Sequence, residues 1–432
     1  MNKSSETIKV IRTNNLGIRP HTSVSITALK GLAATWQWQS IELTTYYSNV
    51  NLDGKVEYNA CSGKYYVSSV SRHGYYRTQR DIAKKGKVNE QVIGSTLVYQ
   101  HPTKSAELGI NMLYSHYSVP IHPKISRRNN PLRFRGQHHA NGSVFYRYLW
   151  QNFHFLGEGA LSQDGGKAAL MGVVASLSRY ADVTVLGRYY GQSFHSPYGK
   201  AFRENSTSNS NESGVYLGTR ISPLHCLCLD AYHDYFYFPW CFGQSRAGHS
   251  WLVRASYQPT RTSLIYLQYK TTTKPRGAAK TKEVTVGTRQ NYKLLWQYTL
   301  GQTISLKSEV QYSSYQQMGV SGWGYAAAQN IAYKVRSFQI TGHVVWFHVE
   351  GANNVLYTYE PNFPHTGFNF RPHRGIGACY GVLVYYRPTA SFRLALKYSL
   401  THHKNQNTMS SVQKTSQGSK KNDIALQATL KF

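Results

Sequence analysis

Apolar and polar residues alternate one by one along the last segment of the chain, residues 421–432. Side chains of a β-strand point alternately to two faces, so this pattern predicts a strand with one lipid-compatible face and one polar face. A strand of a soluble β-sandwich would show the same alternation, so the other segments must decide between the two. The lipid-compatible face holds Ile424, Leu426, Ala428, Leu430 and Phe432, and the other holds Asp423, Ala425, Gln427, Thr429 and Lys431.

The same alternation recurs along the whole chain. The clearest pair of segments covers residues 291–317, with the turn Gly301-Gln302 between them. It predicts an antiparallel hairpin whose inner face is polar except for Leu295. The complete pattern predicts about nineteen strands. They start near residues 31, 40, 91, 106, 141, 152, 168, 182, 212, 225, 249, 262, 288, 303, 323, 337, 375, 390 and 421.

Short and long connections alternate between these strands. Outer-membrane barrels are built in this way, with the short turns on the periplasmic side. We therefore expect an all-β fold, a transmembrane antiparallel up-and-down β-barrel of about 18 to 20 strands. The last strand resembles the C-terminal strand of such barrels, in which a terminal aromatic residue, here Phe432, is part of the signal read by the insertion machinery. The longer connections are expected near residues 50–90, 119–140, 193–211, 237–248, 273–287, 350–374 and 403–420.

Residues 1–432 form a single outer-membrane barrel domain in this interpretation, because no change of composition marks a linker. The first twenty residues lack the apolar core of a secretory signal. An odd number of strands also leaves the barrel seam unmatched, so an upstream strand would be weak or missing, and residues 6–12 would supply part of it. Both observations predict an N-terminally truncated form of a longer precursor.

Composition agrees with a membrane barrel. The 35 Tyr residues lie repeatedly at strand ends, as expected for aromatic girdles at the two membrane surfaces. No segment approaches the roughly 18 to 20 apolar residues of a transmembrane helix. The cysteines lack paired metal-site spacing, and we expect apolar filler residues or one loop disulfide involving Cys241 or Cys379. We predict no metal or cofactor. The five cysteines are Cys61, Cys226, Cys228, Cys241 and Cys379.

The chain is strongly basic, with a formal net charge of +30. Alternation places several bases on inward faces, where a narrow low-dielectric channel strengthens their field. The candidate ligands are small anions, lipopolysaccharide phosphates and nucleic acid. For the loop residues, contact with anionic lipid headgroups explains the charge equally well. The inward bases are Arg147, Arg254, Lys270, Lys293, Lys307, Arg393, Lys397 and Lys431, and the loop bases are Lys124, Arg127, Arg128, Arg133 and Arg135.

Catalysis has little support in the sequence. No nucleophile motif such as GxSxG occurs, and His233 and Asp234 are neighbours in a strand, so their side chains point to opposite faces. We do not expect an enzyme. One basic segment, Arg77 to Lys87, has helix-forming residues and a helix stop at Gly86, which predicts a helical turn over the barrel mouth.

Three segments carry a resemblance to a known family: GYYRTQRDIAKKG at 74–86, YGKAFRENSTSNSNESGVYLGTRISP at 198–223 and LDAYHDYFYFPW at 229–240. With the strand pairs after residue 249, they resemble the C-terminal barrel of Bacteroidota helix-hairpin-helix domain proteins, over roughly residues 15–432. In that family the barrel follows a signal peptide and periplasmic helix-hairpin-helix units, which resemble those of competence-type DNA-binding proteins. Neither is found in this sequence.

The leading hypothesis is an outer-membrane barrel of a Gram-negative bacterium with a basic lumen, for passage or docking of an anionic polymer such as DNA. Its expected partners are outer-membrane lipid, lipopolysaccharide and the barrel insertion machinery. A passive anion-selective porin or structural barrel is the second hypothesis. A soluble basic nucleic-acid-binding β-protein is the third.

Overall fold

The computed structural model describes residues 7–8, 10, 29–61, 63–72, 76, 78–103, 105–124, 131–205, 208–241, 243–277, 284–351, 353–364, 366, 369–404, 408–411 and 414–430. Regular structure in these residues is β-strand apart from one short helix, α1 (Gln79–Ile82), so the expected all-β fold is confirmed. No helix of the described part is long and apolar enough to cross a membrane.

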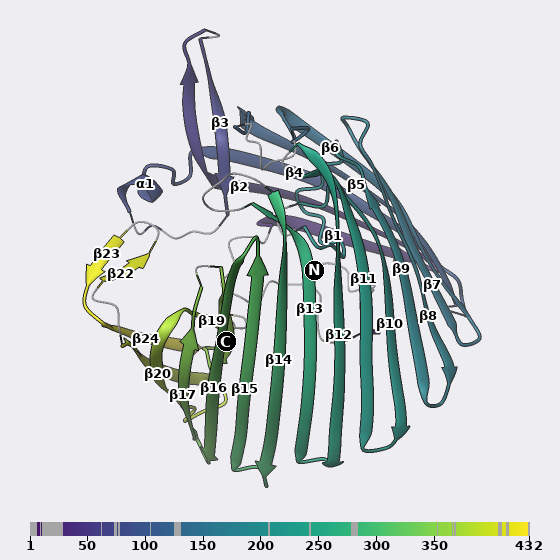
Figure 1. The fold of residues 1–432 in the computed structure, drawn as a ribbon. Coiled ribbons are helices and arrows are strands. Elements are labelled where there is room, and N and C mark those ends of the chain that lie inside the picture. The colour runs from purple at the N-terminus through teal and green to yellow at the C-terminus, as the bar shows by residue number, and fades with distance from the viewer. Residues whose placement is uncertain are drawn as a thin grey trace.

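Twenty strands form one sheet, and all of them except β3 follow each other in chain order around a central space (Figure 1). Without β3 the wall has nineteen strands, and each corresponds to a strand expected from the alternation. The wall strands are β1 (Gly31–Trp38), β2 (Ile41–Asn59), β4 (Val88–Gln100), β5 (Ala106–Ile121), β6 (Gly136–Trp150), β7 (Phe153–Ser162), β8 (Lys167–Ser178), β9 (Ala181–Tyr190), β10 (Glu212–Leu224), β11 (Leu227–Cys241), β12 (Gln244–Thr260), β13 (Ser263–Gly277), β14 (Val284–Leu300), β15 (Ile304–Gln317), β16 (Val320–Val335), β17 (Phe338–Val349), β20 (Gly375–Tyr386), β21 (Phe392–His403) and β24 (Lys420–Leu430).

Short turns join wall strands at one end of the barrel, and the long connections lie at the other (Figure 1). Two expected long connections are wrong. β11 runs to Cys241 and β12 starts at Gln244, so residues 242–243 alone join them in place of the connection expected at 237–248. β13 ends at Gly277 and β14 starts at Val284, so most of the connection expected at 273–287 is also strand. A strand crosses the bilayer with only about 9 to 11 residues. β11 and β12 have 15 and 17 residues, so they continue as paired strands beyond the membrane.

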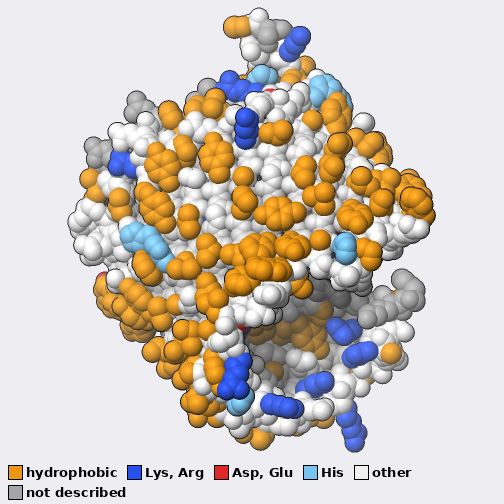
Figure 2. Space-filling model, turned by 90° about the vertical axis from the view of Figure 1, so that its right-hand side faces the viewer, with side chains coloured by type: hydrophobic (Ala, Val, Ile, Leu, Met, Phe, Trp, Pro, Cys, Tyr) orange, Lys and Arg blue, Asp and Glu red, His pale blue; other side chains and the backbone are white. Residues whose placement is uncertain are grey.

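The outer face of the wall is apolar (Figure 2). Outward side chains on one hairpin, Leu294, Trp296 and Val310, are 46–52% exposed. The alternation expected for the last strand is confirmed in its described part. Ile424 and Leu426 are 74% and 66% exposed on the outward face. On the other face, Asp423 pairs with Arg371 (3.4 Å) and Gln427 donates to the carbonyl of Pro364 (3.3 Å). An apolar surface of this extent is favourable against lipid rather than water.

The described wall has two open edges. β1 and β24 are its first and last strands, and they do not pair with each other within the described residues. Every residue of β1 is exposed. Phe432 and Lys431 lie outside the described residues, so the proposed insertion signal stays a prediction.

The expectation that residues 6–12 extend the wall as a strand is wrong for the part that is described. Thr7 and Ile8 lie inside the barrel, where their carbonyl groups accept hydrogen bonds from the inward hydroxyls of Tyr216 (2.9 Å) and Thr184 (3.0 Å). Inward side chains thus replace a neighbouring strand as partners of this segment. The next described residue completes a buried apolar cluster of Val10, Leu186, Phe202, Tyr216, Tyr232 and Leu252.

All five cysteines are free, so the expected alternative of a loop disulfide is wrong. Cys379 is buried in wall strand β20, whereas Cys241 ends β11, seven strands away in the sheet order. Disulfide geometry requires the two Cα atoms to lie within about 7 Å of each other.

Four short pieces of regular structure lie outside the wall order within the described residues. β3 (Lys64–Ser71) pairs with the outer half of β2 and forms a projecting hairpin. β18 (Leu356–Glu360) and β19 (Asn369–His373) form a hairpin in the β17–β20 connection, and β22 (Thr408–Ser411) pairs with β23 (Lys414–Gln417) between β21 and β24. The expected helical turn is α1, whose N-cap residue Thr78 forms a capping box with Asp81.

Candidate functional site

The β2–β3 hairpin stands above the long-connection end of the wall (Figure 1). β2 pairs with β4 from Ile41 to Leu52 and then with β3 from Asp53 to Asn59. Its base is held by a buried apolar cluster, which makes the projection a continuation of the wall rather than an independent loop. This cluster consists of Leu52, Val67, Val88 and Tyr117.

Two tyrosines are paired near the tip of this hairpin. The rings of Tyr58 and Tyr65 have centroids 5.2 Å apart and are 58% and 62% exposed. Exposed aromatic rings on a basic surface provide stacking platforms for nucleic-acid bases. The sequence analysis missed this pair, because it treated residues 50–90 as one connection.

Two basic connections are attached to the hairpin. The amide of Gly54 donates to the carbonyl of Lys84 (2.9 Å), and the amide of His122 donates to the carbonyl of Val67 (2.8 Å). Glu57 of the hairpin forms ion pairs with Lys55 and Lys124. We name the resulting area the basic hairpin surface. It consists of the exposed residues Lys55, Tyr58, Lys64, Tyr65, Arg80, Lys85, Lys87, Lys124, Arg133 and Arg135.

Three of the five predicted loop bases, Lys124, Arg133 and Arg135, therefore lie exposed at the long-connection end. Arg127 and Arg128 lie outside the described residues. The structure adds the bases of the α1 segment, which the sequence analysis singled out only as a helical turn.

The predicted inward bases of the described wall do face the lumen, and three of them have carboxylate partners there. Arg147 pairs with Glu107 at 2.8 Å, and Lys293 pairs with Glu309 at 2.7 Å. Lys397 pairs with Glu360, which belongs to the β18–β19 hairpin rather than to the wall, at 3.2 Å.

The other predicted bases have different surroundings. Arg254 donates to Gln268 and lies 4.5 Å from the ring centroid of Tyr266. The ammonium group of Lys307 lies 4.7 Å from the ring centroid of Tyr359. Strand register places the remaining two on the inward face: Lys270 opposite Leu252, and Arg393 opposite Thr429. Lys431 lies outside the described residues, and anion binding by these bases stays a prediction.

The most buried ionic group is one that the alternation did not select. Arg188 lies between Glu212 and Asp234 at 2.7 Å from each, and all three side chains are fully buried. Gly214 lies opposite Arg188 in the β9–β10 register, and a Cβ at this glycine would come within 2.8 Å of the guanidinium. The absence of a side chain there gives the arginine its space.

The β9–β10 connection, residues 191–211, folds into the lumen. Phe202 packs on Tyr216, and its carbonyl accepts a hydrogen bond from Tyr190 (2.7 Å). At the other side of the lumen, Tyr198 donates to Glu90 of β4 (2.7 Å). The connection therefore reaches from β10 across to β4.

His195 anchors the same connection to β6. Its carbonyl accepts hydrogen bonds from Asn141 (2.6 Å) and His139 (3.0 Å), and its ring lies 3.7 Å from Asp164. Burial lowers the pKa of His195 to about 4, although Asp164 opposes this shift. The ring is therefore neutral at neutral pH.

The β17–β20 connection also folds inward, through the β18–β19 hairpin. Glu360 lies between Arg371 (3.3 Å) and Lys397 (3.2 Å), and Thr358 shares a hydrogen bond with His373 (2.7 Å). Burial lowers the pKa of His373 to about 3. Apolar contacts fix the start of the hairpin in a cluster of Ala326, Ala328, Val345, Phe347, Val349, Leu356 and Cys379.

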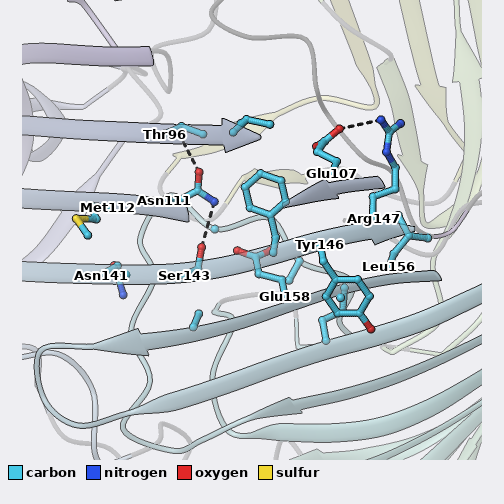
Figure 3. Close-up of a pocket in the computed structure, with 18 of the residues that line it drawn as sticks. Thr96, Glu107, Asn111, Met112, Asn141, Ser143, Tyr146, Arg147, Leu156 and Glu158 are labelled. Atoms are coloured by element: carbon cyan, nitrogen blue, oxygen red, sulfur yellow. Dashed lines mark hydrogen bonds and ion pairs between the residues drawn. The ribbon is translucent and has the colours of Figure 1, made fainter. Parts of the chain in front are cut away.

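A cavity of about 930 Å³ lies within the lumen along β4 to β9, beside the 191–211 connection. Figure 3 shows Glu107 and Arg147 pointing toward each other in it, and Asn111 bonded to both Thr96 and Ser143. The polar side chains that line this cavity include both acids and bases. A second cavity, of about 650 Å³, lies between the β18–β19 hairpin and strands β21 and β24.

The described residues contain no group of three or more metal-ligating side chains. The predicted separation of His233 and Asp234 is confirmed: Asp234 is buried in the lumen beside Arg188, whereas His233 stacks on Trp251 of the outer face, with ring centroids 3.9 Å apart.

Comparison with solved structures identifies the architecture. The siderophore receptor PirA from Acinetobacter baumannii superposes with a TM-score of 0.50 and 8% sequence identity, over 93% of this chain and 70% of PirA. This chain has the fold of an outer-membrane β-barrel. The FrpB iron transporter from Neisseria meningitidis (F3-3 variant) gives a TM-score of 0.45 and 9% identity, over 86% of this chain and 66% of FrpB. The chain thus spans slightly less than two thirds of FrpB. No protein family and no curated protein matches the sequence.

Proposed function

We propose that this barrel lies in the outer membrane of a Gram-negative bacterium, docks DNA on the basic hairpin surface, and admits it after the lumen segments rearrange. The observation that carries the proposal is the combination on one projecting hairpin of a paired, exposed Tyr58–Tyr65 platform with surrounding Lys and Arg. Basic side chains neutralise backbone phosphates and aromatic rings stack on bases, which is how sequence-independent DNA binding is achieved.

Two further observations support this proposal. The net charge of +30 favours a polyanion as the partner. The resemblance of residues 74–86, 198–223 and 229–240 to barrels that accompany periplasmic DNA-binding units favours DNA among polyanions. Lipopolysaccharide phosphates and the insertion machinery are the partners that we propose for the membrane-embedded part.

The filled lumen argues for a gated passage over a permanently open one. Three segments lie inside the barrel: the described residues Thr7, Ile8 and Val10, the described part of the 191–211 connection, and the β18–β19 hairpin. Barrels of this size enclose an aqueous channel only when no segment fills them. A passive anion-selective porin is the alternative function, and its inward bases would then have to conduct ions past these segments.

The test of docking is a binding titration of refolded protein with a labelled short duplex at about 50 and 200 mM salt. Gln substitutions at Lys85, Lys87 and Lys124 should weaken binding and lower the magnitude of the salt slope by up to about 3. The matched control carries Gln at three exposed arginines of the short-turn end, and its binding should equal that of the wild type. The control arginines are Arg261, Arg336 and Arg387.

Planar-bilayer conductance then separates the two functions. A closed barrel whose rare openings are blocked by duplex DNA at low salt supports gated docking. A steady anion-selective current that ignores DNA supports the porin. Equal loss of DNA binding in both triple variants would show that only overall charge matters, and the hairpin proposal would fail.

A further inference from the structure

Two arginines on adjacent wall strands flank one tyrosine near the long-connection end of the lumen. The guanidinium carbon of Arg276, on β13, lies 5.5 Å from the ring centroid of Tyr315, and that of Arg289, on β14, lies 5.6 Å from it. Strand register places Arg289 directly opposite Tyr315. Tyr315 is buried, so both guanidinium groups are gathered at one side of the lumen.

Three donors at this place have no acceptor within the described part of the chain. They are the Nε atoms of Arg276 and Arg289 and the side-chain nitrogen of Asn354, and all three atoms are buried. Asn354 is fully buried, and its oxygen already accepts a hydrogen bond from Ser313 (3.0 Å), which fixes the amide. A buried donor without a partner is costly. Each of these three donors therefore lacks a hydrogen-bond acceptor.

Two other arginines of the lumen are arranged differently. Arg188 has two carboxylate partners and Arg72 has Glu90. Among the described residues, neither Arg276 nor Arg289 lies within ion-pair distance of an acid, and Arg374 adds further positive potential at Arg289. Like charges in a partly desolvated place repel strongly, and a bound anion would remove this repulsion.

Arg289 also holds the β17–β20 connection. Its terminal nitrogen donates to the carbonyl of Asn353 (2.5 Å), next to Asn354. Space at the arginines is kept by Gly287, since a Cβ there would come within 2.9 Å of the Tyr315 hydroxyl and 3.2 Å of Arg276. The wall strands β13 and β14 and the β17–β20 connection thus bring their donors to the same place.

We propose that Arg276, Arg289 and Asn354 form a binding site for a phosphate group, and that its occupation fastens the β17–β20 connection inside the lumen. Phosphate oxygens accept several hydrogen bonds at once, and planar guanidinium groups match this geometry better than they match chloride. A free phosphate ion and a phosphate of a larger molecule share this chemistry. The proposal is independent of DNA docking on the hairpin.

The experiment measures phosphate binding to the refolded full-length chain by calorimetry, against chloride at the same ionic strength. Arg276→Gln should weaken phosphate binding by about 10-fold or more, since it removes a charge-assisted donor pair. The matched control is Arg179→Gln, because Arg179 also lies over a tyrosine ring, that of Tyr180, but is exposed at the short-turn end, outside every proposed site. This control should bind phosphate as the wild type does.

Arg276→Lys keeps the positive charge but lacks the planar guanidinium group. It is the second variant, in case Arg276→Gln does not fold. It should fold as the wild type and still bind phosphate several-fold more weakly. Phosphate should also slow tryptic cleavage after the exposed Arg374 in the wild type but not in either Arg276 variant. If a short DNA duplex competes with phosphate, the site binds phosphodiester groups. If the duplex does not compete, the site binds free phosphate.

Two results would overturn the site: phosphate affinity that equals chloride affinity in the wild type, or an equal loss in Arg179→Gln and Arg276→Gln. Since Arg276 lies outside the basic hairpin surface, its variants should leave duplex affinity at the hairpin unchanged. Failure of the phosphate site and failure of DNA docking are therefore separate outcomes.

Discussion

The hydroxyl of Tyr198 lies 2.7 Å from a carboxylate oxygen of Glu90, joining residues 108 positions apart in the chain. The same hydroxyl accepts a hydrogen bond from Arg72 (3.1 Å), which also pairs with Glu90. This contact fastens the far end of the 191–211 connection to β4. A single oxygen atom thus helps to keep the lumen filled.

Removal of that oxygen should loosen the connection. Tyr198→Phe leaves the ring packed but removes two hydrogen bonds to charged partners, the one donated to Glu90 and the one accepted from Arg72. Each such bond contributes about 1.5 to 3 kcal/mol. We expect faster tryptic cleavage after Lys200 and more frequent channel openings in a planar bilayer. Tyr312→Phe is the control, since this exposed tyrosine lies on the outward face of β15, away from the connection. Cleavage of Tyr198→Phe at the wild-type rate would show that the hydrogen bond does not hold the segment.

Acidification should release the same connection. The pKa of His195 is lowered by burial to about 4, against 6.5 for an ordinary histidine, so the unfolded segment takes up a proton that the docked one resists. Stability is therefore unaffected above pH 6.5 and falls as the pH drops from about 6.5 to 4. Asp164 favours the proton, whereas His139 and Arg133 oppose it.

Thermal unfolding followed by tryptophan fluorescence at pH 7 and pH 4.5 measures this effect. His195→Gln should reduce the drop in unfolding temperature between the two pH values, whereas substitution of the exposed His122 by Gln should not. An unchanged drop in His195→Gln would assign the acid sensitivity to other histidines, such as His373.

Arg188 should be the least replaceable lumen base. Arg188→Gln leaves Glu212 and Asp234 buried without a counter-charge, which costs about 3 to 5 kcal/mol of unfolding free energy. Urea unfolding in detergent measures the loss. Further substitution of Glu212 by Gln and Asp234 by Asn should recover most of it. If the triple variant were no more stable than the single one, packing rather than charge would explain the effect.

The outward face should reject charge that the inward face accepts. Leu294→Arg places a cation against lipid near the middle of β14 and should lower stability by about 2 to 4 kcal/mol. Gln297→Arg places the same side chain on the inward face of the same strand and should cost much less. Equal losses in urea unfolding would mean that β14 does not face lipid at Leu294.

The sequence predicted the wall well because one physical rule governs it. A strand between lipid and lumen must alternate, so the existence of all nineteen wall strands, with starts within about five residues, and the inward direction of Leu295 followed from the residues alone. Outside the membrane a strand has no lipid-facing side, so the alternation no longer applies. There, paired strands continue through segments such as 237–248 without the apolar face that marks them.

The lumen contents were not predictable in this way. The segment at Thr7, the 191–211 connection and the β18–β19 hairpin are fixed by single contacts with distant strands, such as Tyr216 to Thr7 and Tyr198 to Glu90. No periodic pattern of apolar and polar residues in the sequence predicts such contacts. Arg276 follows the even spacing of Lys270 and Lys274 and was still missed, because residues 273–287 were interpreted as a connection.

The projecting hairpin places its tip at a distance from most of the barrel rim. β3 pairs with seven residues of β2, from Asp53 to Asn59, which extends the hairpin by about 23 Å beyond the last β2–β4 pair. Electrostatic influence in physiological salt decays over about 8 Å. A polyanion at the tyrosine platform therefore meets first the nearby bases Lys55, Lys64 and Lys124, of which Lys124 pairs with Glu57 at 3.2 Å. Only dilute salt would let the rest of the barrel rim add to this attraction.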